Sequence, residues 1–461
     1  MKKKHIQHLY WRVGFGISPS ELEKLSKKNK KHIVSGLFKS SSSHTALEVD
    51  TSEIKAVFSG MMSEKLDPKT RMEIQKMSRQ KQMELNAAWI ERLSTSKEVL
   101  REKMTLFWAN HFVCEDNNIV YIQNFNNTLR KYALGNFRDF VNAISKEAAM
   151  TKYLNTKQNR KHKPNENFAR ELMELFTLGE GQYTEQDIKE SARAFTGYSH
   201  NIKGEFVFRK WAHDFEDKTF FGKTGNFSGE DIVDIILNKK QCATYICGKL
   251  YKYFVSETIN KNHVNELADV FYKDYNIETV MRHMLLADWF YDAQHIGNKI
   301  KSPIEFLVGI KTVVPTEFKN RKQLIYIQRL LGQTLLDPPN VAGWKGGRNW
   351  IDSNTIVLRL KLPSMLLNSG YISKVKEGHG SVLSEEMNAK FNKTYGRWIK
   401  TDVNWDDFNK TYKNVKLNSL QEYILACDIN TDTKNYLDTL QKNSKQEYCI
   451  QLMSLPEYQM C

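Results

Sequence analysis

Several features that would narrow the function quickly are missing from this sequence. No stretch approaches the roughly 18 apolar residues that a membrane-spanning helix needs, so no membrane span is expected. The chain runs from Lys2–Lys4 directly into polar residues such as His5 and Gln7, without a secretory signal, so a cytoplasmic location is expected. The six cysteines include no C-x-x-C pair, which favours free thiols in a reducing compartment.

The familiar catalytic motifs are also absent from the sequence. It contains no G-x-S-x-G nucleophile turn, no G-x-x-x-x-G-K-[ST] phosphate loop, no dinucleotide-binding G-x-G-x-x-G after a strand and no H-E-x-x-H zinc motif. Gly14 and Gly16 precede a capped helix and predict a tight backbone turn rather than a cofactor loop. Any catalytic or metal site must therefore assemble from residues that lie far apart in the sequence.

The charge of the chain is strongly positive. There are 68 lysines and arginines against 53 acidic residues, a formal net charge of +15. Such an excess attracts nucleic acid, anionic polysaccharide or membrane headgroups, although a solvated lysine-rich surface explains it more simply. The densest basic runs, Met1–Lys4 and Lys27–Lys31, lack the interleaved aromatic side chains that stack on bases. We therefore expect no nucleic-acid partner.

Helical signals dominate the sequence. Ser18-Pro19 and Ser302-Pro303 are each followed by a glutamate that can close a capping box, and Thr184 and Ser228 predict two further helix starts. Apolar residues recur every three to four positions in the segments 80–113, 124–153, 241–256, 263–273 and 277–291. The predicted fold is mainly α, a large multi-helix globular protein with a small β-hairpin element.

The β element and the domain organisation follow from weaker signals. The strand-like segments 206–208 and 219–221 are expected to pair as a hairpin, with 211–217 as the loop between them. Residues 1–365 are expected to form the main helical body. Residues 366–461 are expected to form a C-terminal helical segment that packs on that body or makes a sub-domain, and the weak periodicity of 375–405 indicates a boundary or excursion near its start.

The densest polar segment is 159–174, where Pro164 can open a helix. Helical spacing places Phe168, Leu172, Leu175 and Phe176 on an apolar face, and Asn167, Arg170, Glu171 and Glu174 on the other. Arg170 can pair with Glu166 or with Glu174, each four residues away. The polar face either meets solvent or lines a site in which Glu171 and Glu174 bind one cation or act as acid and base.

Two histidine contexts and one loop are further candidates. His111 lies among aromatic residues, where a buried ring needs either a hydrogen-bond partner or a metal. His213 is followed by Asp214, a carboxylate that can orient the ring or add a ligand. The loop 338–351 carries two tryptophans and an arginine that would offer a stacking surface for a sugar ring or peptide, unless the tryptophans simply pin the loop.

Several long motifs occur in the order typical of one family. They are His8–Gly16, Arg101–Met104, Phe107-Trp108, Asn110–Phe112, Pro164–Gly179, Tyr183–Asp187, Ala194–Gly197, His213-Asp214, Lys301–Pro303, the loop 338–350 and Ser454–Gln459. Through them the chain resembles the bacterial domain of unknown function 1800 family over nearly its whole length.

This resemblance implies a helix-rich fold and no established reaction. Many relatives look exported and are encoded beside a sulfatase-like family, which implies a sulfatase-like partner and a role in the envelope or with polysaccharide. The chain departs from the family pattern in having no export signal. It also has Ala109 where many relatives carry a second histidine, and Phe176 where some carry histidine. Both departures weaken a histidine-based metal site.

Two hypotheses remain open. The first is an enzyme for an anionic or saccharide-like substrate, with Glu171, Glu174, Arg170 and His111 as catalytic residues, a divalent metal held by Glu171, Glu174, His213 and Asp214, and substrate contacts from Asn167, Trp344, Arg348 and Trp350. The second is a non-catalytic module that binds a saccharide or peptide, or that acts as a scaffold for the sulfatase-like partner. Residues that line one cleft favour the enzyme; residues that lie apart in buried pairs favour the module.

Overall fold

The structure, a computed structural model, describes residues 1–59, 67–368, 399–439 and 444–461. The N-terminal third of the chain contributes helices rather than strands to this described part. They are α1 (Lys3–Val13), α2 (Pro19–Ser26), α3 (Lys30–Ser40), α4 (Ser52–Ser59), α5 (Pro68–Thr95), α6 (Val99–Ala109), α7 (Ile119–Tyr132), α8 (Phe137–Lys146), α9 (Ala148–Tyr153) and the short 3-10 helix η1 (Thr156–Gln158). The segments predicted from apolar spacing are helical, and the two longest are divided into several helices by residues such as Asn136, whose side chain accepts from two backbone N–H groups of α8.

The middle of the chain continues this pattern. Its longer helices are α10 (Asn167–Glu171), the π-helix η2 (Leu172–Thr177), α11 (Glu185–Ala194), α12 (Gly229–Leu237), α13 (Lys240–Phe254), α14 (Lys261–Phe271), α15 (Ile277–Leu286), α16 (Pro303–Val313) and α17 (Arg321–Leu330). Its 3-10 helices are η3 (Lys210–Ala212), η4 (Asp288–Tyr291), η5 (Ala293–His295) and η6 (Gly347–Trp350). The capping boxes at Thr184, Ser228 and Ser302 are present, each worth about 1 kcal/mol.

The predicted hairpin is wrong in its pairing. Both predicted segments form strands, but β2 (Phe206–Phe208) pairs with β1 (Tyr198–His200), and β3 (Lys218–Phe220) pairs with β4 (Lys223–Gly225). Short loops explain the choice, because Gly204 at φ +86° and Gly222 at φ +75° each turn the chain back on its nearest neighbour. The predicted mainly α fold with a small β element is nevertheless confirmed in the described residues.

The C-terminal part returns to the main body. It contains α18 (Ser353–Leu367), β6 (Thr401–Val403), α20 (Trp405–Thr411), η7 (Leu417–Ser419), α21 (Gln421–Ile424), α22 (Thr431–Thr439), α23 (Lys445–Met453) and η8 (Pro456–Gln459). β6 pairs with β5 (Thr316–Phe318), and Met460 forms a bridge with Ile300. The predicted boundary between 365 and 366 falls inside α18, and most of the weakly periodic segment 375–405 lies outside the described residues.

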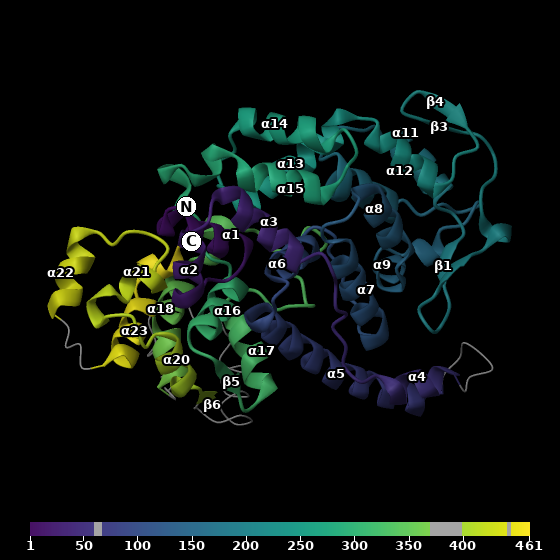
Figure 1. The fold of residues 1–461 in the computed structure, drawn as a ribbon. Coiled ribbons are helices and arrows are strands. Elements are labelled where there is room, and N and C mark those ends of the chain that lie inside the picture. The colour runs from purple at the N-terminus through teal and green to yellow at the C-terminus, as the bar shows by residue number, and fades with distance from the viewer. Residues whose placement is uncertain (60–66, 369–398, 440–443) are drawn as a thin grey trace.

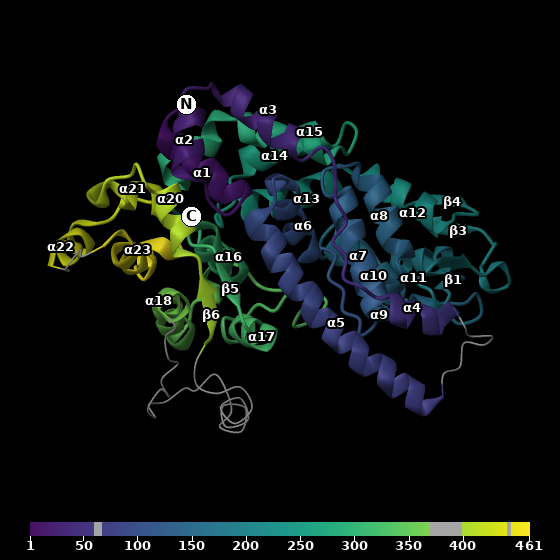
Figure 2. The ribbon, with the colours of Figure 1, turned by 60° about the horizontal axis from the view of Figure 1, so that its bottom comes forward.

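The molecule is elongated, and its first four short strands and its C-terminal helices lie at opposite ends. Strands β1 to β4 lie at one end and helices α20 to α23 at the other (Figure 1). The 28-residue helix α5 runs from the middle of the molecule to its lower edge in Figure 2, and it packs against α6, α7, α16 and α17. Within the described residues, no helix combines the length and apolarity needed to cross a membrane.

Candidate functional site

The polar segment 159–174 does not continue as one regular helix. Helix α10 begins at Asn167, three residues after Pro164, because the side chain of Asn159 accepts from the backbone N–H of Asn165 and holds the chain in a turn. From Leu172 the helix widens into a π-helix, and the N–H groups of residues 178 and 179 both donate to the carbonyl of Met173. Such wide turns are uncommon and occur mostly at functional sites.

The carbonyl groups of the π-helix are satisfied by side chains from other helices. The Tyr245 hydroxyl lies 3.2 Å from the carbonyl oxygens of Glu174 and Leu175, and the Lys249 ammonium donates to Leu175 at 2.9 Å. The His111 Nε2 lies 3.1 Å from the carbonyl of Phe176. These contacts join the end of α6 and the middle of α13 to the wide turn. Sequence reasoning missed Tyr245 and Lys249, because only the meeting of the helices gives them a role.

Burial lowers the pKa of two basic side chains in this contact network, His111 and Lys249. His111 is buried, and burial together with the nearby Lys249 holds its pKa well below the ordinary histidine value. A neutral ring that donates from Nε2 to Phe176 leaves Nδ1 as an acceptor, 3.4 Å from the Lys249 ammonium. Burial lowers the pKa of Lys249 to about 8. His111, predicted to be catalytic, is therefore held in an internal contact.

The two glutamates of the polar face remain near one another. Glu171 is half-buried. Its pKa is raised mainly by this burial and also by the negative charge of Glu174. Glu174 accepts from the Tyr183 hydroxyl at 2.7 Å, a partner that sequence reasoning missed. These carboxylates keep some exposure, so they are the part of the predicted site that stays accessible. Asn167 is exposed beside them at the start of α10.

Arg170 is turned away from those glutamates. Its guanidinium forms a two-pronged pair with Glu185 at 3.0 and 2.9 Å and contacts Glu166 at 3.3 Å. The predicted pair with Glu166 is confirmed, whereas the alternative pair with Glu174 is not the one that forms. The wide turn explains this difference, because it removes the four-residue spacing that would have aligned Arg170 with Glu174.

The predicted ligands His213 and Asp214 belong to a separate contact network. The His213 Nδ1 lies 2.7 Å from the carbonyl of Thr196, and Asp214 accepts from the Arg193 Nε at 2.7 Å. Burial alone would raise the pKa of Asp214, but hydrogen bonds from Arg193 and a backbone N–H hold it below the ordinary value. In the described residues, no three His, Cys, Asp or Glu side chains gather as a metal site, so the predicted four-residue metal set is not brought together.

The tryptophan loop, residues 338–351, is held by Asn110 at the C-terminal end of α6. The side-chain amide of Asn110 donates to the Trp344 carbonyl at 3.0 Å and accepts from the Trp344 N–H at 2.8 Å. Trp350 is buried, so it lies in the interior and offers no open stacking face; the predicted two-tryptophan surface is wrong at this residue. Trp344 is half-buried and Arg348 is exposed. The loop is thus pinned, as the structural alternative predicted.

A second group of motif residues meets in the core, where sequence reasoning placed no centre. Lys103 pairs with Glu305 at 2.5 Å and donates to the Gly14 carbonyl; Gly14 and Lys103 come from different motifs, and Glu305 follows the Lys301–Pro303 motif. The Lys301 ammonium donates to the Tyr458 carbonyl, and burial lowers its pKa to about 7. These buried charges tie the N-terminal, central and C-terminal motifs together. Their signal in the sequence was a charged residue inside each otherwise apolar stretch.

Motifs that lie far apart in the sequence therefore meet in the core. A family model described as "Protein of unknown function (DUF1800)" matches residues 8–460 of the chain. The chain belongs to the DUF1800 family. No curated protein and no solved structure matches it. The first and last motifs of this DUF1800 protein meet in the core, where Trp11 and Tyr458 are in contact, but membership of the family assigns no reaction.

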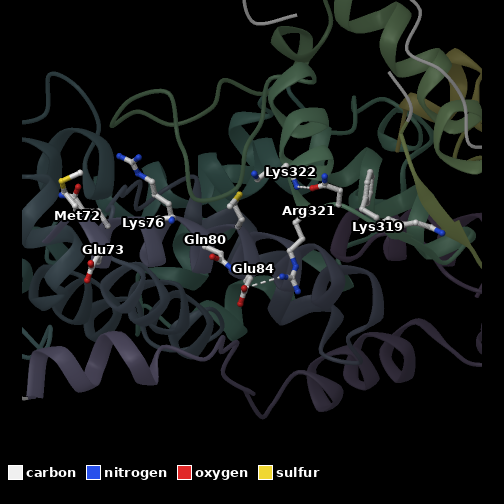
Figure 3. Close-up of a pocket in the computed structure, with 13 residues that line it drawn as sticks. Met72, Glu73, Lys76, Gln80, Glu84, Lys319, Arg321 and Lys322 are labelled. Carbon is white, nitrogen blue, oxygen red and sulfur yellow. Dashed lines mark hydrogen bonds and ion pairs between the residues drawn. The ribbon is translucent and has the colours of Figure 1, made fainter. Parts of the chain in front are cut away.

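Among the surface grooves in the described part of this DUF1800 protein, we consider two that lie away from the residues predicted as catalytic. The larger, of about 1110 Å³, lies between α5 and residues 318–322 (Figure 3). Its lining mixes both signs of charge, and Arg321 contacts Glu84 at 3.5 Å across it. The smaller, of about 570 Å³, lies between residues 158–163 and η3. None of the predicted site residues lines either groove.

Proposed function

We propose that this chain is a non-catalytic binding protein for an anionic, saccharide-like ligand. The observation that carries the proposal is the separation of three residues predicted to be catalytic or metal-binding. Arg170 is paired with Glu185, His111 contacts the Phe176 carbonyl, and Asp214 is paired with Arg193. A general acid or base must reach the reacting atoms, and side chains held in separate internal contacts do not converge on a substrate.

The charge of the chain supports an anionic ligand. The chain has 15 more basic than acidic side chains, and Arg160, Lys161 and Lys163 face the smaller surface groove. A cationic surface concentrates anions around the protein and speeds their capture. A ligand held in this way needs no chemical step by the protein.

Mass balance tests the proposal. The full chain is incubated with a mixture of sulfated and uronic-acid oligosaccharides, the bound fraction is separated, and the ligand masses are compared before and after by mass spectrometry. We expect a retained fraction with unchanged masses. The Glu171→Gln, Glu174→Gln double variant should retain the same fraction. New masses that require the chain and vanish in the double variant would overturn the proposal in favour of an enzyme.

An enzyme centred on the π-helix is the second candidate, and one observation favours it. Lys249, with a pKa lowered to about 8, lies beside the wide turn that carries Glu171 and Glu174. Perturbed lysines of this kind are common in catalytic sites. In this case Lys249→Met should abolish turnover of a substrate that the variant still binds, whereas the binding proposal expects no turnover to lose.

The resemblance to relatives with a sulfatase-like neighbour extends the first proposal. A protein that holds a sulfated saccharide would present it to an enzyme that removes sulfate. Co-purification of the tagged full chain with the neighbouring sulfatase-like protein, dependent on added sulfated saccharide, tests this partnership. Association that is identical without saccharide would assign a scaffold role instead.

A further inference from the structure

The smaller groove combines positive charge with an exposed aromatic ring. Arg160, Lys161, His162 and Lys163 are exposed and line it together with Gln158, Trp211 and Ala212. Trp211 is 64% exposed, an unusual degree for the largest apolar side chain. None of the seven lining residues is acidic. The groove is therefore cationic on one wall and aromatic on the other.

The cationic wall is a tight turn with fixed ends. The Lys163 N–H donates to the Arg160 carbonyl at 2.8 Å, and these two residues form an antiparallel bridge. The Lys161 N–H donates to the carbonyl of Ala212, next to Trp211. Both walls are thus joined through one backbone hydrogen bond. A site that is held in place before the ligand arrives loses less entropy on binding.

Asn159 anchors this turn in the interior. It is 2% exposed, its side-chain amide donates to the Ala192 carbonyl at 2.7 Å, and its side-chain oxygen accepts from Asn165. Its own carbonyl accepts from the N–H of Gly197, which has φ +81°. The exposed turn is therefore attached to α11 and to the strand β1 rather than free in solvent. This arrangement presents the cations in a fixed direction.

The cations of the turn are not neutralised by the protein. In the described part of the chain, Arg160, Lys161 and Lys163 form no ion pair within 4.0 Å. Arg170, only a few residues further on, is by contrast paired with two glutamates. The Arg160 guanidinium lies over the Trp211 ring at 5.5 Å, and the indole stays 64% exposed beside it.

The chemistry of the two walls selects the ligand. Sugar rings stack their C–H face on an indole, and sulfate or carboxylate groups on the ring would meet the lysines and arginine of the turn. A single-stranded nucleic acid uses a longer basic track and several stacking rings, whereas one exposed tryptophan lines this groove. Its volume of about 570 Å³ suits a small ligand portion.

We propose that the groove between the Arg160–Lys163 turn and Trp211 binds an acidic or sulfated sugar ring, with the indole under the ring and the turn around its anionic groups. This inference rests on the proposed binding function and names its site and ligand class. The turn is joined through Gly197 to the start of β1, and Figure 1 shows β1 at the end of the molecule opposite the C-terminal helices.

The test is calorimetric titration of the full chain with a heparin tetrasaccharide at physiological salt. We expect Trp211→Ala to weaken binding by at least about fivefold, since stacking on an aromatic ring contributes on that order. We expect the Lys161→Ala, Lys163→Ala pair to weaken it by about three- to tenfold, in line with exposed charge contacts. The matched control Lys27→Ala, Lys28→Ala removes the same charge from an exposed run elsewhere and should change binding by less than about twofold.

Each outcome of the titration decides something. Equal weakening by the groove pair and the control pair would show charge attraction without a site and overturn the proposal. Tight binding that both groove variants leave unchanged would refute this site but keep the binding function. Binding of a charge-matched oligothymidine in place of the tetrasaccharide, or no tetrasaccharide binding at all, would refute the ligand class. New reducing ends during titration would refute the binding function itself.

Discussion

Two stretches that lie close in the sequence, the turn 160–163 and the π-helix 172–177, have opposite environments. In the exposed turn 160–163, the charged side chains point to solvent and only the backbone is bound to the protein. In the π-helix 172–177, side chains from α6 and α13 contact the backbone carbonyls. Polar groups that lie close in the sequence can therefore have different roles in the structure. Where the chain is buried, polar groups satisfy one another; where it is exposed, they remain available to a ligand.

The largest effect should come from a deeply buried charge pair. Lys103→Met leaves Glu305 without its ion-pair partner, and we expect the free energy of unfolding to fall by about 3–5 kcal/mol. Urea denaturation measures this change. Lys3→Met is the control, since the Lys3–Glu23 pair is half exposed and should change stability by under about 0.5 kcal/mol. Equal losses in the two variants would remove the distinction between buried and exposed polar groups.

Two glycines with the same backbone angle sharpen the comparison. Gly343 and Gly181 both have φ +76°, but a Cβ at Gly343 would lie 2.3 Å from the side-chain oxygen of Asn110, and at Gly181 it would meet open space. We expect Gly343→Ala to cost about 2–4 kcal/mol and Gly181→Ala about 1 kcal/mol. Thermal and urea unfolding of both variants measure the difference. Similar costs would mean that the tryptophan loop is not held tightly against α6.

The Asp214 network should be next in size. Arg193 pairs with Asp214 at 2.7 Å, with Glu190 at 3.0 Å and with the exposed Glu216 at 3.5 Å, so Arg193→Met leaves three carboxylates without their cation. We expect a loss of about 2–3 kcal/mol, measured by urea denaturation. Arg348→Met, at an exposed position, is the comparison variant and should stay within about 0.5 kcal/mol. A stable Arg193→Met would return His213 and Asp214 to the candidates for ligand binding.

The last effect in this comparison is a pH dependence at Lys249. Because burial lowers its pKa to about 8 in the folded state, the unfolded chain binds more protons than the folded chain between pH 8 and the ordinary lysine value near 10.4. Stability from this group should therefore rise as pH rises through that interval. Lys249→Met removes the titration, so the wild type should gain stability relative to the variant from pH 8 to 10. A difference that stays flat with pH would show that Lys249 keeps an ordinary pKa.

Much of the fold was predictable because its signals are local. The caps at Thr184, Ser228 and Ser302 depend on residues three positions apart, and all three form as predicted. The predicted strand pairing is wrong because the chain turns back at Gly204 and at Gly222. Glycine is a recognised turn signal, so this part of the fold was predictable. The π-helix had no such signal, because its wide turn depends on Tyr245, Lys249 and His111 arriving from other helices.

The candidate site was less predictable than the fold. Residue types and spacing identified Glu171 and Glu174, which do remain together. They gave no indication that Arg170 would choose Glu185, which lies beyond the π-helix and a loop. The smaller groove brings the polar run 160–163 beside Trp211, which the sequence places only in a loop. Local spacing does not predict such contacts between distant segments.

The most direct test of the account is the free energy of unfolding of His111→Leu in urea. If His111 serves the π-helix, its loss leaves the buried Phe176 carbonyl without a donor, and stability should fall by about 1–3 kcal/mol. The exposed His32→Leu, as control, should change it by less than about 0.5 kcal/mol. A His111→Leu protein as stable as the wild type would contradict the account and restore His111 as a residue kept for chemistry.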